Sequence, residues 1–147
     1  AGGTTHDKTV FAGSGSKKVL YIEDNPANIK LVTQLLGNVP DVVLYTAHTP
    51  ELGIALASSH FPDLILLDIN LPGQDGYQVL KRLRAEAALQ HIPVIAVTAN
   101  AMQRDVERGK QAGFAYYITK PIHIERFVAL VQAYLQGQNY ADIYPKQ

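Results

Sequence analysis

Short apolar runs alternate with longer segments of helical periodicity five times along the chain, and this alternation restricts the possible folds more than any other feature. Each run is rich in β-branched and aromatic residues, which is typical of strands buried on both faces. The segments between the runs repeat their apolar residues at helical spacing. Strands that alternate with helices predict an α/β fold with a parallel sheet covered on both faces. The runs comprise residues 19–22, 42–45, 64–67, 94–97 and 115–118.

Most of the predicted helices begin with a residue that can cap a helix, followed by proline or glycine. Asparagine, threonine and aspartate accept hydrogen bonds from the first free amides of a helix, and proline is favoured at the first helical position. Glycine is favoured just beyond the last turn. The predicted starts are Asn25-Pro26, Thr49-Pro50, Asp75-Gly76 and Asn100, and a last helix is expected after Pro121. Gly113 is expected to end the helix that Asn100 begins.

Length and composition are those of one domain with a substantial core. The chain has 147 residues, of which 47% are hydrophobic, so global disorder is excluded. Thirteen basic residues balance thirteen acidic ones, which argues against direct nucleic-acid binding and against a polybasic membrane surface. The absence of cysteine excludes disulfides, thiol catalysis and cysteine-ligated metals. No apolar run is long enough to span a membrane.

The glycine- and serine-rich start differs in texture from the rest of the chain. Residues 1–17 are therefore predicted to be a flexible linker or tail, residues 18–137 the folded domain, and residues 138–147 a C-terminal tail. The first residue is Ala1 rather than methionine. From this we expect the domain to be a piece of something longer, preceded by other sequence.

Polar residues follow the apolar runs at one predicted edge of the sheet. Glu23 and Asp24 follow the first run, Asp68 the third, Thr98 the fourth and Lys120 the fifth. In a five-stranded sheet of order 2-1-3-4-5, the first and third strands are neighbours where the strand order reverses, and ligands bind there. We therefore expect the three carboxylates to converge in one crevice.

Three neighbouring carboxylates repel one another unless a cation neutralises them. Oxygen ligands in an open site suit Mg²⁺, which keeps several waters and takes one or two carboxylates. Glu23, Asp24 and Asp68 with one Mg²⁺ and the Lys120 ammonium would sum to zero charge. The sequence thus predicts a magnesium site beside a lysine.

These residues lie in motifs that resemble the receiver domains of two-component response regulators. The resemblance covers about residues 17–137, and it implies the five-stranded, doubly wound, flavodoxin-like fold already predicted. Each fragment alone is common, but their order and distances together are specific. The motifs are VLYIEDN at 19–25, LLDINLPG at 66–73, DG at 75–76, VTANA at 97–101 and ITKP at 118–121.

The resemblance implies a role for each residue of the acidic crevice. Asp68 looks like the phosphoacceptor, whose carboxylate attacks the phosphorus of a phosphohistidine. Asp24 and Asp68 would bind Mg²⁺ directly, Glu23 through water, and Asn70 through its backbone carbonyl. A domain of this kind is a phosphorylation-dependent switch that catalyses at most its own phosphoryl transfer and dephosphorylation.

The resemblance also implies how phosphorylation would be sensed. Thr98 would donate a hydrogen bond to the phosphoryl group and Lys120 would form an ion pair with it. Tyr117 occupies the aromatic switch position three residues before the lysine, and the Lys120-Pro121 peptide bond is expected to be cis. The output surface would be formed by the fourth helix, fifth strand and fifth helix, which also offers a face for dimerisation.

The expected partners are a histidine kinase or a histidine phosphotransfer domain, and the expected location is the cytoplasm. We expect this domain itself to contact neither nucleic acid nor membrane. The sequence as a whole resembles receiver domains found at the C-terminus of hybrid histidine kinases, which is the expected context. A stand-alone, single-domain regulator is the alternative context. A pseudo-receiver that binds a partner without phosphorylation also stays open.

Two other classes share parts of the pattern. Phosphatases of the haloacid dehalogenase type also use an aspartate at a strand end, but a second aspartate follows two residues later, where this chain has Asn70. An amide cannot exchange a proton usefully at that position. Flavodoxin-like electron carriers share the fold, but three carboxylates would repel a flavin phosphate.

Overall fold

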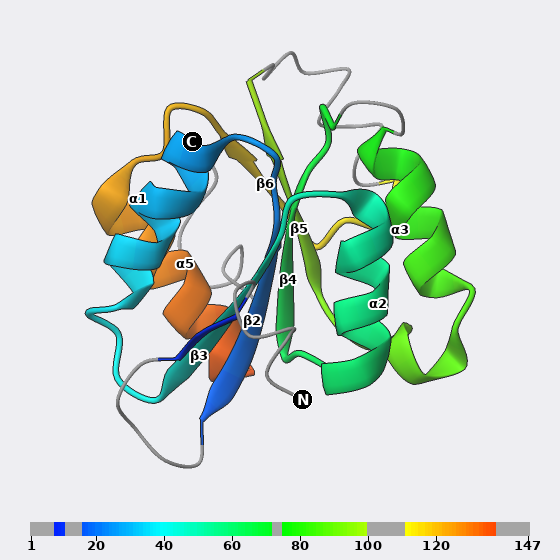
Figure 1. Ribbon diagram of the computed structural model, residues 1–147, viewed down its shortest axis with the longest axis horizontal. Helices are drawn as coiled ribbons and strands as arrows, with labels where there is room; N and C mark the ends of the chain where they lie inside the picture. The colour runs from blue at the N-terminus through cyan, green and yellow to red at the C-terminus, as the bar shows by residue number, and fades with distance from the viewer. Residues whose placement is uncertain (1–7, 11–15, 72–74, 100–110, 138–147) are drawn as a thin grey trace.

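A six-stranded sheet lies between two layers of helices in the computed structural model (Figure 1). The structure describes residues 8–10, 16–71, 75–99 and 111–137. The strands are β1 (Lys8–Val10), β2 (Lys17–Ile22), β3 (Val42–Ala47), β4 (Leu64–Asp68), β5 (Val94–Thr98) and β6 (Tyr116–Thr119). The helices are α1 (Pro26–Leu36), α2 (Pro50–His60), α3 (Gly76–Arg84), the short 3₁₀ helix η2 (Ala87–Leu89) and α5 (Ile124–Leu135).

The sheet has the strand order β1-β3-β2-β4-β5-β6. All neighbours from β3 to β6 pair in parallel, which confirms the predicted order 2-1-3-4-5 of a doubly wound fold. The order reverses at β2, which pairs with β3 on one side and with β4 on the other. The carboxyl ends of β2 and β4 are therefore adjacent.

Successive residues of the central strands contribute to opposite faces of the sheet, as strand geometry requires. On β2, Leu20 packs in the core cluster that contains residues of α2 and α3, whereas Tyr21 packs in the cluster that contains residues of α1 and α5. Figure 1 shows these two pairs of helices on opposite sides of the sheet. The central strands β4 and β5 are buried throughout, which explains their continuous apolar runs.

The predicted helix starts are confirmed where the structure describes them. The side chain of Asn25 accepts hydrogen bonds from the first turn of α1, and Thr49 does the same for α2. Asp75 and Gln78 form a reciprocal capping box at the start of α3. The last helix follows Pro121, as predicted, and begins at Ile124.

The N-terminal stretch corrects the linker prediction. Within residues 1–17, which the glycine and serine content predicts to be a flexible linker, Lys8–Val10 forms β1 and Lys17 begins β2. Strand β1 pairs antiparallel with β3, with Thr9 opposite Leu44. A free sheet edge offers unpaired backbone groups to any nearby extended segment, and threonine and valine favour that conformation. Composition alone misses this pairing because it depends on an edge that exists only in the folded sheet.

Some predictions fall outside the described residues. These are the cap at Asn100, most of the helix after it, the last two residues of the LLDINLPG motif (Pro72-Gly73) and the tail at 138–147. Gly113 has φ of 108°, a conformation that favours glycine at the end of a helix.

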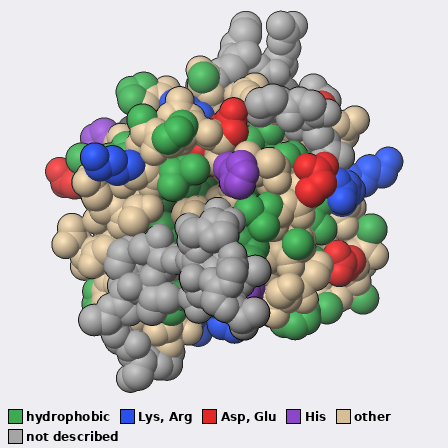
Figure 2. Space-filling model, in the orientation of Figure 1, with side chains coloured by type: hydrophobic (Ala, Val, Ile, Leu, Met, Phe, Trp, Pro, Cys, Tyr) green, Lys and Arg blue, Asp and Glu red, His purple; other side chains and the backbone are tan. Residues whose placement is uncertain are grey.

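Among the described helices, none is both long and apolar enough to cross a membrane. On the face seen in Figure 2, acidic and basic side chains are interspersed.

Candidate functional site

The site lies where β2 and β4 end side by side. Leu67 pairs with Ile22, so the next residue of each strand, Asp68 and Glu23, emerges at the same edge of the sheet. Both side chains are buried, with residue exposures of 2% and 0%. Asp24, one residue further along, is exposed. The strand-order reversal thus brings together residues that are far apart in the sequence.

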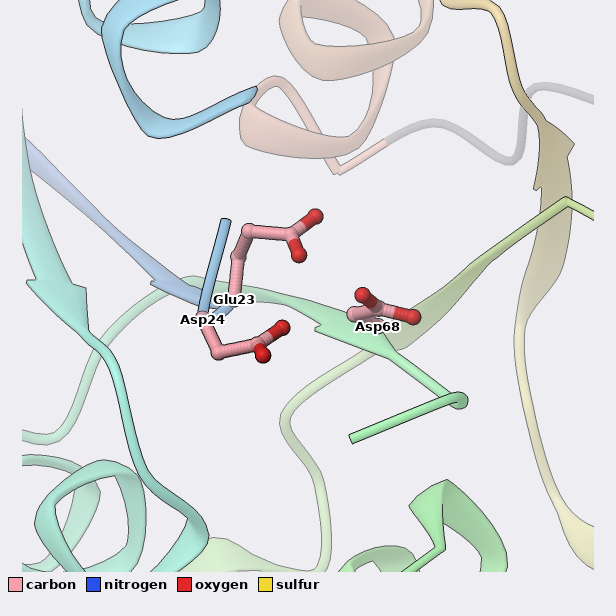
Figure 3. Close-up of side chains that lie close together, drawn as sticks. All are labelled: Glu23, Asp24 and Asp68. Atoms are coloured by element: carbon pink, nitrogen blue, oxygen red, sulfur yellow. The ribbon is translucent and has the colours of Figure 1, made fainter. Parts of the chain in front are cut away.

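Glu23, Asp24 and Asp68 form an acidic cluster (Figure 3). One carboxylate oxygen from each lies within 4.8 Å of the others. Three converging oxygen donors, one of them facing solvent, are a donor set that fits Mg²⁺ with part of its water shell retained. The predicted convergence of the carboxylates is therefore present in the structure.

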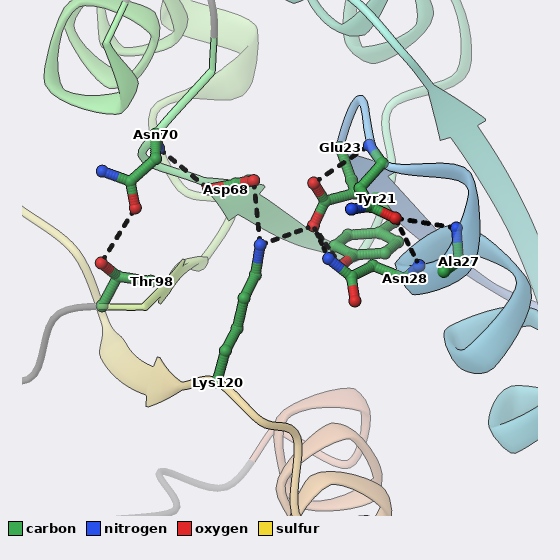
Figure 4. A network of polar contacts seen from close by, with 9 residues as sticks. Tyr21, Glu23, Ala27, Asn28, Asp68, Asn70, Thr98 and Lys120 are labelled. Carbon is green, nitrogen blue, oxygen red and sulfur yellow. Dashed lines mark hydrogen bonds and ion pairs between the residues drawn. The ribbon is translucent and has the colours of Figure 1, made fainter.

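Lys120 reaches the same cluster from the end of β6 (Figure 4). Its Nζ lies 3.1 Å from Asp68 Oδ2 and 3.2 Å from Glu23 Oε1. Burial alone would lower the pKa of the Lys120 ammonium, but its hydrogen bond to Asp68 and the two carboxylate charges outweigh burial and raise it. Lys120 therefore remains charged and bridges two acids. The Lys120-Pro121 peptide bond that follows is cis.

Glu23 is the most enclosed of the three acids. Burial raises its pKa, and the neighbouring Asp68 raises it further, whereas hydrogen bonding from Tyr21 and the charge of Lys120 act in the opposite direction. The Tyr21 hydroxyl donates to Glu23 Oε1 at 2.8 Å, and Asn28 Nδ2 donates to the same oxygen at 3.3 Å. Burial, followed by the charge of Glu23, raises the pKa of Tyr21, so this hydroxyl stays protonated and remains a donor.

Tyr21 and Asn28 are site residues that sequence reasoning missed. Tyr21 resembles any other core residue of an apolar run, and Asn28 any polar residue in the first turn of a helix. One signal was available, because residues two apart on a strand share a face and Tyr21 precedes Glu23 by two. The contact of Asn28 depends on how α1 sits on the sheet.

Asn70 and Thr98 form the other side of the site (Figure 4). The backbone N–H of Asn70 donates to Asp68 Oδ1 at 2.9 Å. The hydroxyl of Thr98, which is fully buried at the end of β5, donates to Asn70 Oδ1 at 3.1 Å. Thr98 is thus linked to Asp68 through Asn70.

Tyr117 lies in β6, on the side of the sheet that α2 and α3 cover. Its residue is half-buried in β6, and its ring packs against the core cluster that contains α2 and α3 residues. Tyr116 packs against the opposite cluster, so the two tyrosines face opposite sides of the sheet, as the alternation of strand residues predicts. The structure therefore brings together six of the predicted site residues, whereas Tyr117 packs on the α2–α3 side of the sheet.

The site combines a buried aspartate at a strand end, two further acids and a lysine, and it lies at the edge of five parallel strands. Comparison with known sequences shows which family has this arrangement. The sequence profile described as the response regulator receiver domain matches residues 19–132. The chain belongs to this family, whose members are signalling domains of two-component systems.

Particular relatives are similar over most of the chain. The polar-differentiation response regulator DivK of Brucella ovis is 44% identical over 120 residues, which cover 82% of this chain and 97% of DivK. Among solved structures, one similar chain is the receiver domain of sensor histidine kinase PA1611 from Pseudomonas aeruginosa PAO1, which was solved with magnesium in its active site cleft. It is 30% identical, has a TM-score of 0.75, and the match covers 83% of this chain and 99% of that one. The Mn²⁺-bound response regulator Rcp1 is 29% identical with a TM-score of 0.66, covering 79% and 89%.

Proposed function

We propose that Asp68 accepts a phosphoryl group from a phosphohistidine of a histidine kinase or a histidine phosphotransfer domain. The observation that carries the proposal is the position of Asp68: its carboxylate is buried between two acids and Lys120, which is 3.1 Å away. A carboxylate can act as the nucleophile in such a transfer. The Lys120 ammonium pairs with this carboxylate at 3.1 Å and, with a metal, can neutralise charge on the transferred group.

The acidic cluster would hold the magnesium ion. Asp24 and Asp68 would ligate it directly, the backbone carbonyl of Asn70 would add an oxygen, and Glu23 would accept a hydrogen bond from a metal-bound water. A bound Mg²⁺ supplies charge neutralisation at the phosphoryl oxygens. Support comes from the donor chemistry and from two relatives solved with Mg²⁺ and Mn²⁺.

The transfer needs little more than position and charge. An oxygen of Asp68 forms a bond to phosphorus while the bond from phosphorus to the histidine nitrogen breaks, which leaves an aspartyl phosphate and a neutral imidazole after proton uptake. Lys120 follows the developing charge from the carboxylate to the phosphoryl oxygens. The Thr98 hydroxyl, which donates to Asn70 at 3.1 Å, would then exchange this bond for one to the phosphoryl group.

The added charge would act as the switch. An acyl phosphate carries about −1.5 to −2 in place of one carboxylate charge, so Thr98 and Lys120 would shift toward it. Tyr117 would respond to the space that Thr98 leaves, and the surface of the fourth helix, β6 and α5 would change partner affinity or dimerisation. The helix concerned lies largely outside the described residues.

We also propose that this receiver acts in the cytoplasm within a phosphorelay. Placement at the C-terminus of a hybrid histidine kinase would let it pass phosphate onward to a phosphotransfer domain. The relative DivK, matched over 97% of its length, supports the stand-alone alternative. The gene sequence upstream of Ala1 decides between the two contexts.

The test is incorporation of one phosphoryl group from acetyl phosphate with Mg²⁺, read as the mass of the intact protein. We expect Asp68→Asn to abolish incorporation and EDTA to prevent it in the unmodified chain. Asp41→Asn is the matched control, because Asp41 is exposed and its φ of 62° is well tolerated by asparagine. Absence of incorporation in the unmodified chain, with a folded domain, would favour a pseudo-receiver that binds its partner without phosphorylation.

A further inference from the structure

Glu23 is held by more donors than any role as a simple metal ligand requires. Its residue is fully buried, and both of its oxygens accept hydrogen bonds or an ion pair. The donors to Oε1 are the Tyr21 hydroxyl at 2.8 Å, Lys120 Nζ at 3.2 Å and Asn28 Nδ2 at 3.3 Å, and the donor to Oε2 is the Asn25 backbone N–H at 3.3 Å.

The donors are distributed unequally between the two oxygens. Three of them converge on Oε1, whereas the Asn25 backbone N–H donates to Oε2. A carboxylate has about four lone-pair sites in all. Oε1 is therefore saturated and fixed in direction, while Oε2 retains capacity for another donor, such as a water molecule bound to a metal.

Tyr21 and Asn28 belong to rigid elements. The Tyr21 ring is fully buried in the core between the sheet and the α1–α5 layer, so its hydroxyl cannot follow a moving partner. Asn28 lies in the first turn of α1, where the Asn25 side chain caps the Ala27 and Asn28 amides. Both donors are thus fixed by the fold, whereas Lys120 is the donor that must leave when a phosphoryl group arrives.

We propose that Tyr21 and Asn28 are positioning residues that hold the Glu23 carboxylate in one orientation, with Oε2 directed to the hydration shell of the metal. This inference rests on the proposed metal-dependent phosphoryl transfer. Without the two donors, Oε1 of Glu23 would be held by Lys120 alone, and the carboxylate would turn when Lys120 moves to the phosphoryl group. Residues that orient ligand groups from outside the coordination sphere typically affect metal affinity about 10- to 100-fold.

The test measures metal affinity and transfer rate separately. Binding of Mn²⁺, counted by electron paramagnetic resonance of the free ion, should weaken about tenfold in Tyr21→Phe. Asn28→Ala removes the longer hydrogen bond, from a half-buried residue, and should weaken Mn²⁺ binding about threefold. This variant keeps the test open if Tyr21→Phe, a core substitution, unfolds the chain. Tyr45→Phe is the matched control, a buried sheet tyrosine that packs in the opposite core cluster. At saturating Mg²⁺ the transfer rate of both variants should return to that of the unmodified chain.

A double substitution tests whether the effect passes through Glu23. In a Glu23→Ala background, Tyr21→Phe should leave Mn²⁺ affinity unchanged. Loss of thermal stability with unchanged affinity in Tyr21→Phe would overturn the inference, and so would an effect that persists without Glu23. If the unmodified chain binds no Mn²⁺, the proposed function itself fails. If it binds Mn²⁺ and Tyr21→Phe binds equally well, only the positioning role fails.

Discussion

Glu23 and Asp68 are both buried carboxylates that share Lys120, but their surroundings differ. Glu23 accepts from a core tyrosine, a helix asparagine, a backbone amide and the lysine. Asp68 accepts from the Asn70 backbone N–H and from Lys120 among the described groups. Besides the shared Lys120, Glu23 has three donors held by the fold, whereas Asp68 has one backbone amide.

This difference separates two tasks within a single acidic site. A group that orients a metal must stay in place, so it is fixed by neighbours whose own positions are set by packing. A nucleophile must leave its partners during the reaction, so a displaceable cation suits it better than rigid donors. The comparison predicts that changes at Glu23 can be compensated by more metal, whereas changes at Asp68 cannot.

The largest effect on stability is expected for Lys120→Met. The substitution keeps most of the side-chain length but leaves two adjacent buried carboxylates without their shared cation. We expect the free energy of unfolding in metal-free buffer to fall by about 3 kcal/mol, because removing one partner from buried charges is strongly destabilising. Urea unfolding followed by circular dichroism measures this change.

Addition of Mg²⁺ should restore part of that loss, since the ion supplies positive charge at the same carboxylates. The control is Lys81→Met, which removes an exposed lysine from α3. Equal unfolding free energies for Lys120→Met and the unmodified chain without metal would mean that the two carboxylates do not depend on the lysine.

Two glycines sharpen the comparison at the level of the backbone. A Cβ at Gly76 would lie 2.5 Å from the backbone Cα of Ile69, the residue after Asp68. A Cβ at Gly53 would lie 2.5 Å from Cδ1, the end of the side chain of Ile22, the residue before Glu23. Gly76→Ala should therefore cost about 2–3 kcal/mol, the upper part of the range for overpacking, and Gly53→Ala about 1 kcal/mol, because a side-chain end moves more easily than backbone. Thermal unfolding compares the two, and a larger cost at Gly53 would show that the Ile22 side chain yields less than the backbone at Ile69.

Glu23→Gln tests the proposed tolerance to metal concentration. The amide keeps the size of the side chain and an oxygen for Tyr21, but it loses the negative charge toward Mg²⁺. We expect the Mg²⁺ concentration for half-maximal phosphorylation to rise about tenfold, with the maximal rate retained. Measurement of initial rates over a Mg²⁺ series checks this, with Glu125→Gln on the exposed first turn of α5 as control. A rate that stays low at all Mg²⁺ concentrations would place Glu23 with Asp68 among the reacting groups.

Most of the fold was predictable because it depends on local patterns. The strand runs, the caps at Asn25, Thr49 and Asp75, and the order of a doubly wound sheet follow from periodicity, hydrogen-bonding chemistry and chain handedness. Convergence of the acids at the ends of β2 and β4 follows in turn, since parallel strands share one ligand-binding edge.

The parts that could not be predicted depend on contacts between distant segments. Pairing of β1 with β3 requires a free edge that exists only after the sheet has formed, so a glycine-rich segment gave no sign of it. The donors to Glu23 were likewise hidden, because Tyr21 looks like a core residue and the reach of Asn28 depends on the seating of α1. The polarity of a side chain is visible in a sequence, but its partner is not.

The smallest effect on stability is expected at Thr98, where valine preserves the shape of the side chain and removes the hydroxyl. Asn70, which is exposed, can then bond to water, so the free energy of unfolding should fall by only about 0.5–1 kcal/mol. Phosphorylation should nevertheless slow markedly, because the hydroxyl that would follow the phosphoryl group is gone. Thr98→Ser, which keeps the hydroxyl and loses a buried methyl group, should show the reverse, with a greater loss of stability and a rate near that of the unmodified chain. Unfolding curves and initial phosphorylation rates of the two variants separate packing from chemistry, and equal rates in both would remove Thr98 from the transfer step.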